Sequence, residues 1–268
     1  MSDYTPPLDD IAFVLTHLCE IDELAKLEAF THADRATVLG LVEEAGRFMA
    51  TAIAPLNQPA DRQGLRFEDG EVVTPDGFKK AYDQYVDAGW GAVPFDPEYG
   101  GGGFPWVVGV AVQELLTTAS MAFSMGPLLT QGAIDMLQHH ASDEQKATYL
   151  PKMLTGEWTG TMNLTEPQAG SDVGALTTRA VPADDGSYRI TGQKIFISFG
   201  EHDLTDNIIH LVLARLPDAP PGTKGISCFI VPKFVLGEDR TPGERNGVTC
   251  VSIEHKMGIH ASPTCTLA

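Results

Sequence analysis

The stretch that decides the fold is "MNLTEPQAGSD", residues Met162–Asp172. An apolar run leads into "TEP", and the chain then turns through "AGSD". A proline removes a backbone N–H and a glycine allows a positive φ, so a corner of a β-sheet explains these residues without any ligand. Taken alone, the stretch favours this purely structural interpretation.

A second stretch further along the chain favours a binding site over a purely structural corner. "ITGQKIFIS", residues Ile190–Ser198, also places a hydroxyl, that of Ser198, directly after an apolar and aromatic run. Two β-segments that each deliver a hydroxyl beside an aromatic side chain can clamp a flat polar ring between them. The two stretches together therefore indicate a binding site.

The sequence around these stretches divides the chain into two parts. Helical periodicity dominates up to about residue 155, whereas β-rich runs such as "NIIHLVLARL" and "GISCFIVPKF" follow Gly156. Helices that precede strands, rather than alternating with them, indicate an α+β fold. We predict a helical N-terminal domain over residues 1–155 and a β-domain over residues 156–268, whose last strand, in "SPTCTLA", is still in progress at Ala268.

Several helices are predicted in the first part. An apolar face extends from Ile11 to Leu27, a second helix begins near Ala33 and ends at Pro55, and a later one begins at Leu128. Ser142 is the expected cap of the last one, which runs to Leu154. The glycines at 100–103 lack the Lys-Ser/Thr of a phosphate-binding loop, so we expect a flexible connector there.

Composition excludes several classes of protein. The chain has 268 residues and a net charge of −18, which repels nucleic acid. The N-terminus has no secretory signal, and no apolar run is long enough for a membrane span. Four widely spaced cysteines favour a reducing cytoplasm. Adjacent His139 and His140 point to different sides of a helix, so no metal site is predicted.

The two stretches, in this order and spacing, resemble the acyl-CoA dehydrogenases. "LTEPQAGSD", "ITGQKIFIS" and "KGISCFIVPK" are similar to that family's middle domain, and "HKMGIHASPTC" is similar to its next strands. The resemblance covers nearly the whole chain and is greatest to the longer subfamily that includes 3-methylmercaptopropionyl-CoA dehydrogenase. It implies a helical N-terminal domain and a middle β-barrel truncated at its C-terminal end, with the family's C-terminal four-helix bundle absent.

The resemblance also implies FAD as cofactor and assigns residues to it. Leu164 and Thr165 are expected at the pyrimidine edge of the flavin, Phe196 against the ring and Ser198 at N5. Gly170 and Ser171 are expected near the FAD pyrophosphate, with Ser171 also reaching the phosphopantetheine arm of the substrate. Glu166 is interpreted as structural. The full set of expected cofactor-binding residues is Met162, Leu164, Thr165, Gly170, Ser171, Phe196, Ile197 and Ser198.

The activity that the resemblance implies is α,β-dehydrogenation of an acyl-CoA thioester, with hydride transfer to flavin N5 and an electron-transfer flavoprotein as acceptor. The catalytic base is expected beyond residue 268, so this chain alone is expected to be inactive. The full-length parent is expected to be a homo-oligomer. Two alternatives stay open. One is an acyl-CoA oxidase, and the other is a non-catalytic binding or assembly subunit that keeps the scaffold.

Overall fold

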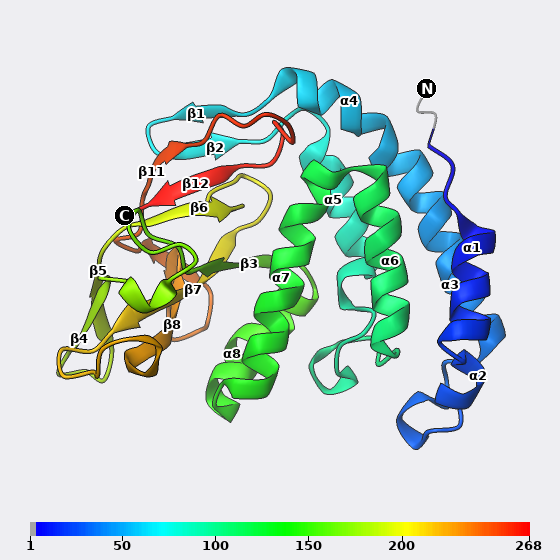
Figure 1. The fold of residues 1–268 in the computed structure, drawn as a ribbon, viewed down its shortest axis with the longest axis horizontal. Coiled ribbons are helices and arrows are strands. Elements are labelled where there is room, and N and C mark those ends of the chain that lie inside the picture. Colours follow the sequence, from blue (N-terminus) through cyan, green and yellow to red (C-terminus); the bar gives the residue numbers. More distant parts are fainter. Residues whose placement is uncertain (1–3) are drawn as a thin grey trace.

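The computed structural model of the protein describes residues 4–268 and has a helical part followed by a part made of strands (Figure 1). This order confirms the predicted α+β fold. Within the described residues, no helical bundle follows the last strand. The helices and helical turns are α1 (Leu8–Phe13), η1 (Val14–Leu18), α2 (Ile21–Leu24), η2 (Glu28–Phe30), α3 (Arg35–Phe48), η3 (Met49–Ile53), α4 (Ala54–Gln63), α5 (Phe78–Asp87), η4 (Trp90–Ala92), η5 (Pro97–Tyr99), α6 (Trp106–Ala119), α7 (Met121–His140), α8 (Asp143–Leu154), η6 (Val173–Ala175) and η7 (Thr223–Gly225).

The strands of residues 4–268 form four sheets. The largest has five strands, in which β7 pairs in parallel with β3 and antiparallel with β8, and β4 joins β7 to β5. In a three-stranded sheet, β12 lies between β11 and β6. The strands are β1 (Arg66–Glu68), β2 (Glu71–Val73), β3 (Trp158–Asn163), β4 (Arg179–Pro182), β5 (Tyr188–Thr191), β6 (Lys194–Ser198), β7 (Asn207–Arg215), β8 (Ile226–Pro232), β9 (Phe234–Leu236), β10 (Pro242–Arg245), β11 (Cys250–Ile253) and β12 (Thr264–Leu267).

The hairpin β1–β2 belongs by sequence to the helical part but packs on the second part. Val72 of β2 shares a small core with Cys250, Cys265 and Leu267 of the three-stranded sheet, and Figure 1 shows the hairpin beside β11 and β12. The sequence pattern does not reveal this hairpin, because each of its strands has only three residues. The packing of this hairpin on the three-stranded sheet joins the two parts of the chain next to β6, the strand that contains the second quoted motif.

The prediction that Pro55 ends the second helix is wrong. Helical structure continues from Arg35 through the π-helical turn η3 to Gln63. Pro55 occupies the beginning of α4, directly after η3, where a missing N–H costs least. A π-helical turn shifts the hydrogen-bond register by one residue, and this shift accommodates the proline without breaking the helix.

The first predicted helix is interrupted. The turn η1 is π-helical and Glu20 has a φ of 50°, so the apolar face expected from Ile11 to Leu27 does not stay in phase. Ile11 and Leu15 are buried, whereas Leu18 is 69% exposed.

The later helices begin where a serine can cap them. The side chain of Ser120 accepts a hydrogen bond from Phe123 N, so α7 begins at Met121 and not at the predicted Leu128, with Pro127 inside the helix. The predicted cap Ser142 is confirmed. It forms a reciprocal capping box with Gln145 at the start of α8.

The glycine-rich segment is not the flexible connector that its composition suggests. The N–H groups of Gly101, Gly102 and Gly103 donate to backbone carbonyls at 2.9, 2.9 and 2.8 Å. A Cβ atom at Gly101 would lie 2.1 Å from Phe95 O. The glycines therefore allow two backbone segments to pack in direct contact, which no residue with a side chain permits.

Candidate functional site

The two motif segments lie side by side, where β3 ends and β6 begins. Ile195 N donates to Thr165 O at 2.9 Å, and Lys194 Nζ donates to Leu164 O at 2.9 Å. Segments about thirty positions apart in the sequence are thus joined by consecutive bonds. This arrangement brings Met162, Leu164 and Thr165 from one segment close to β6.

Large apolar side chains are exposed on these two segments. Met162 is 39% exposed, Leu164 36% and Phe196 57%. Apolar side chains that gather at the surface mark a site for a ligand or partner more often than isolated ones do. The predicted residue Ile197 differs from them, because its side chain is buried in the core of the three-stranded sheet and only its backbone can reach a ligand.

Three hydroxyls at the site have no hydrogen-bond partner within residues 4–268. They belong to Thr165, Ser171 and Ser198, of which Ser171 is exposed and the other two are half-buried. A Cβ atom at Gly170 would lie 3.9 Å from Thr165 Cγ2, so the Gly-Ser turn lies close to the Thr165 side chain. The site therefore offers free donors beside an apolar surface.

Phe196 owes its exposure to an irregular strand. It has a φ of 60°, and the three steps of β6 from Lys194 to Ile197 pair with only two steps of β12, from Leu267 to Cys265. This is a β-bulge, which turns a side chain out of the normal alternation of a strand. A phenylalanine in the left-handed region costs about 1–3 kcal/mol, and such strain occurs preferentially at functional sites.

Beneath the exposed surface, Glu166 and Lys194 form a buried ion pair. Their side chains are 2% and 4% exposed, and Lys194 Nζ donates to Glu166 Oε1 at 2.8 Å. Thr177 and Thr178 each donate both a backbone N–H and a hydroxyl to the same carboxylate, and Gln168 adds a further bond. Glu166 is thus a structural residue, as predicted from the turn motif.

The pKa values of the pair follow from this environment. Burial alone would raise the pKa of Glu166, but the hydrogen bonds from Lys194, Thr178 and Thr177 outweigh it and hold the pKa well below its usual range. Burial lowers the pKa of Lys194, while Glu166 opposes that shift. The carboxylate is therefore ionised and surrounded by donors, and it has no free oxygen with which to accept a proton from a substrate.

A concavity of about 990 Å³ is formed by residues of the strand-rich part together with α7 and α8. Asn163 and Lys194 reach its wall, together with Tyr188, Val212 and Phe229 from the large sheet. Thr165, Ser171, Phe196 and Ser198 are not among its lining residues. The expected binding surface and this concavity are therefore separate features of the strand-rich part.

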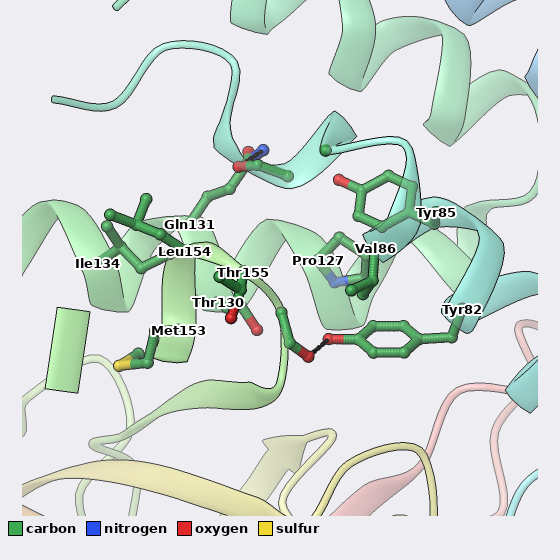
Figure 2. A pocket seen from close by; sticks show the side chains of 13 residues that line it. Tyr82, Tyr85, Val86, Pro127, Thr130, Gln131, Ile134, Met153, Leu154 and Thr155 are labelled. Atoms are coloured by element: carbon green, nitrogen blue, oxygen red, sulfur yellow. Dashed lines mark hydrogen bonds between the residues drawn. The ribbon is translucent and has the colours of Figure 1, made fainter. Parts of the chain in front are cut away.

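A second cavity, between α5, α7 and α8, is too small for an organic ligand (Figure 2). Its volume is about 20 Å³, which holds at most a single water molecule. Tyr82 Oη donates to Gly156 O at 2.9 Å beside it, and Gln131 Nε2 donates to Gly91 O at 3.2 Å. These two bonds join α5 and α7 to the backbone beside the cavity and give it a structural character.

The acid and histidine cluster near residue 201 is structural too. Glu201 is paired with Lys233 and Arg245, and Thr159 Oγ1 lies 2.9 Å from His202 Nε2. His210 contacts Thr161 Oγ1 in the same way at 2.7 Å. Among the described residues, no group of three or more acidic, histidine or cysteine side chains is arranged for a metal ion.

Burial, reinforced by the nearby Lys233 charge, lowers the pKa of both His202 and His210 to about 3. We expect both imidazoles to stay neutral at pH 5 in the folded chain. In the unfolded chain these histidines titrate near 6.5, so their contribution to stability is complete above that pH and is lost as the pH falls toward about 3. Imidazole NMR titration measures this, and a midpoint above pH 6 for both would contradict it.

Two structurally important cations were not assigned from the sequence. Lys194 stands inside the quoted motif, and Arg215 ends the apolar run "LVLAR". The signal in the sequence was a single cation inside or at the end of an apolar strand. Such a residue needs a specific partner when the strand is buried.

Comparison with known proteins gives matches over most of the chain. The family profile "Acyl-CoA dehydrogenase, N-terminal domain" matches residues 38–157, and "Acyl-CoA dehydrogenase, middle domain" matches residues 161–268. Between residues 4 and 268, no helix is both long enough and apolar enough to span a membrane.

Relatives and solved structures match to a similar extent. A 3-methylmercaptopropionyl-CoA dehydrogenase from Ruegeria pomeroyi is 51% identical over 264 residues, covering 98% of this chain and 45% of the relative. A butyryl-CoA dehydrogenase from Syntrophomonas wolfei is 43% identical over 99% of this chain and 44% of its own length. The structure of butyryl-CoA dehydrogenase from Megasphaera elsdenii superimposes with a TM-score of 0.69 at 27% identity, covering 86% of this chain and 55% of that one.

One further structure shares the fold. It is an acyl-CoA dehydrogenase from Bacillus anthracis described as complexed with FAD, with a TM-score of 0.68 at 24% identity, over 87% of this chain and 35% of that one. The chain spans about half the length of the curated relatives it matches.

Proposed function

The chain belongs to the acyl-CoA dehydrogenase family, and we propose that it forms the N-terminal and middle portion of an FAD-dependent enzyme that oxidises an acyl-CoA thioester. The observation that carries the proposal is the exposed apolar surface of Met162, Leu164 and Phe196 beside the free hydroxyls of Thr165 and Ser198. A flat ring system with polar edges needs this combination. The chain's coverage of about half of its relatives supports the further proposal that additional polypeptide completes the enzyme.

Bound FAD would supply the acceptor for the hydride that leaves the β-carbon of the acyl group. Phe196 would offer its exposed face to the ring, and Ser198 would donate to it from the end of β6. Thr165 would place a hydroxyl where negative charge collects during the reaction, which stabilises that charge. Gly170 and Ser171 would approach the phosphates of the cofactor and the pantetheine arm of the substrate.

The base that takes the α-proton is not assigned to a residue of this chain. Glu166 is the carboxylate nearest in sequence to the proposed cofactor residues, but six donors occupy its two oxygens. We therefore propose that the base comes from polypeptide outside residues 1–268. Residues 1–268 alone would then lack the group that removes the α-proton and would not catalyse the reaction.

Thr165→Val in the full-length enzyme is expected to slow reduction of the bound cofactor by substrate about 10- to 100-fold, because a donor to the developing charge is lost. The dissociation constant of the acyl-CoA should change by less than about threefold, since ground-state contacts remain. Stopped-flow loss of the visible absorbance measures the rate. Thr191→Val, at an exposed position on β5, is the matched control, and an unchanged rate in Thr165→Val would refute the assigned role.

The proposal extends to the partners and location of the enzyme. The proposed electron acceptor is an electron-transfer flavoprotein. Trp106 and Val110, one turn apart on α6, are 48% and 60% exposed and support a contact surface, so a homo-oligomer is proposed. The four cysteines are free thiols, which supports a reducing compartment such as the cytoplasm.

Release of peroxide by the full-length protein in air, faster than reduction of an artificial acceptor, would favour an oxidase. A full-length protein that refuses added FAD would favour a non-catalytic scaffold.

A further inference from the structure

Arg215, the last residue of β7, holds two surface loops together. The first loop covers residues 170–176 and the second residues 218–225, and both lie near the end of β4 (Figure 1). The Arg215 guanidinium donates to four backbone carbonyl oxygens, two in each loop, which are Leu176 O at 3.1 Å, Gly174 O, Pro220 O at 3.1 Å and Gly222 O at 2.7 Å.

The positive charge of Arg215 is not neutralised by a carboxylate. Within residues 4–268 its guanidinium has no ion pair, although the chain has 36 acidic and only 18 basic residues. Asp172 and Asp218 lie in the same two loops but accept no bond from it. Lys224 in the second loop adds further positive charge. Carbonyl dipoles orient the guanidinium, but they do not cancel its charge.

The loops also carry free hydrogen-bond donors. In the described part of the chain, the backbone N–H groups of Gly170, Ser171 and Thr223 make no hydrogen bond, and neither do the hydroxyls of Ser171 and Thr223. All three residues are exposed. A Cβ atom at Gly174 would lie 3.6 Å from Gly222 Cα, so the loops are in direct contact. Free N–H groups beside an unneutralised cation favour an anion with several oxygens.

We infer that Arg215 is a positioning residue that fixes these two loops as a cradle for a pyrophosphate group and supplies a positive charge beneath it. The inference rests on the proposed function, which brings two pyrophosphates to the protein, that of FAD and that of the coenzyme A thioester. The guanidinium acts through the loops and touches no reacting atom. Lysine at this position would keep the charge but could not bind four carbonyls in one plane.

The test uses the full-length protein and the variants Arg215→Met and Arg215→Lys, with Arg179→Met as the matched control, because Arg179 is exposed and has no side-chain hydrogen bond among the described residues. Three quantities are measured. They are amide hydrogen exchange of residues 170–176 and 218–225, retention of FAD after gel filtration, and KM for an acyl-CoA compared with the matching acyl-pantetheine thioester, which has no pyrophosphate.

Arg215→Met should accelerate exchange in both loops and weaken binding of one pyrophosphate about tenfold or more, with Arg215→Lys intermediate and Arg179→Met unchanged. Loss of FAD at an unchanged KM identifies the cofactor as the bound group. If KM rises for the acyl-CoA but not for the acyl-pantetheine thioester, at an unchanged kcat, the bound group is the pyrophosphate of the substrate. If Arg215→Met does not fold, the same comparison is made with Arg215→Lys.

Unchanged FAD retention and unchanged KM values in a folded variant would overturn the inference. A failure of the proposed function differs from this result, because the wild-type protein itself would then hold no FAD and oxidise no thioester. In that case, binding of inorganic pyrophosphate to the wild type but not to Arg215→Met would still support the cradle, and binding by neither would refute it.

Discussion

Replacing Lys194 with methionine is expected to destabilise the fold by about 3–5 kcal/mol, because it removes one partner of a fully buried ion pair and leaves the other charged. Lys194 is 4% exposed and Glu166 is 2% exposed, so water does not replace the lost partner. The same change removes the bond to Leu164 O, which holds the turn against β6. Urea unfolding of the variant beside the wild type gives the difference in free energy.

A double-mutant cycle separates the ion pair from the rest of the effect. Glu166→Gln alone leaves a buried ammonium, whereas Glu166→Gln combined with Lys194→Met removes both charges. The double variant should therefore lose less unfolding free energy than the sum of the losses in the two single variants. Lys80→Met, at an exposed position on α5, is the control and should change stability by less than about 0.5 kcal/mol. A Lys194→Met variant as stable as this control would contradict the importance of the pair.

The pair also predicts a dependence on pH. The pKa of Glu166 is about 4.5 in the unfolded chain and lower in the folded one. Its stabilisation is therefore complete above about pH 4.5 and is lost as the pH falls toward the folded value. Unfolding free energies measured from pH 7 down to pH 3 should fall less steeply for Glu166→Gln than for the wild type below pH 4.5. Equal slopes would show that this carboxyl is not perturbed.

Gly101→Ala is the second change with a large expected effect, a loss of about 3 kcal/mol or more. The new Cβ atom would lie 2.1 Å from Phe95 O and 2.3 Å from Phe95 C, and both are backbone atoms that cannot rotate away. The hydrogen bonds that donate from the glycine segment to the Ala92–Asp96 backbone would be broken or stretched.

Gly40→Ala provides the opposite expectation on the same chain. Gly40 lies inside α3, and a Cβ atom there meets nothing within 4 Å. Alanine should stabilise this helix by about 0.5–1 kcal/mol, because glycine loses more conformational freedom on folding. Thermal or urea unfolding of both variants compares the two glycines. Similar effects at the two positions would refute the packing assigned to Gly101.

The sequence predicted the order of helices and strands and the segments of the site, because these depend on residue type and short spacing. "MNLTEPQAGSD" and "ITGQKIFIS" lie side by side as expected. The ion pair below them could not be predicted, since Glu166 and Lys194 come together only when β6 pairs with the turn after β3.

Other features were missed because a local rule was overridden by tertiary structure. Pro55 normally ends a helix, but the π-helical turn η3 before it changes the register and lets α4 follow. Phe196 occupies a left-handed conformation that its residue type disfavours, and only the pairing of β6 with β12 imposes it. Gly101 looked like part of a flexible segment because the sequence does not show the Phe95 backbone against it.

Anaerobic addition of an acyl-CoA to the purified full-length protein tests the central proposal most directly. The proposal predicts a yellow protein that absorbs at about 450 nm as bound flavin does, and that loses this absorbance when the thioester is added. A colourless protein that takes up no added FAD, or a yellow one that no acyl-CoA of any chain length bleaches, would contradict it.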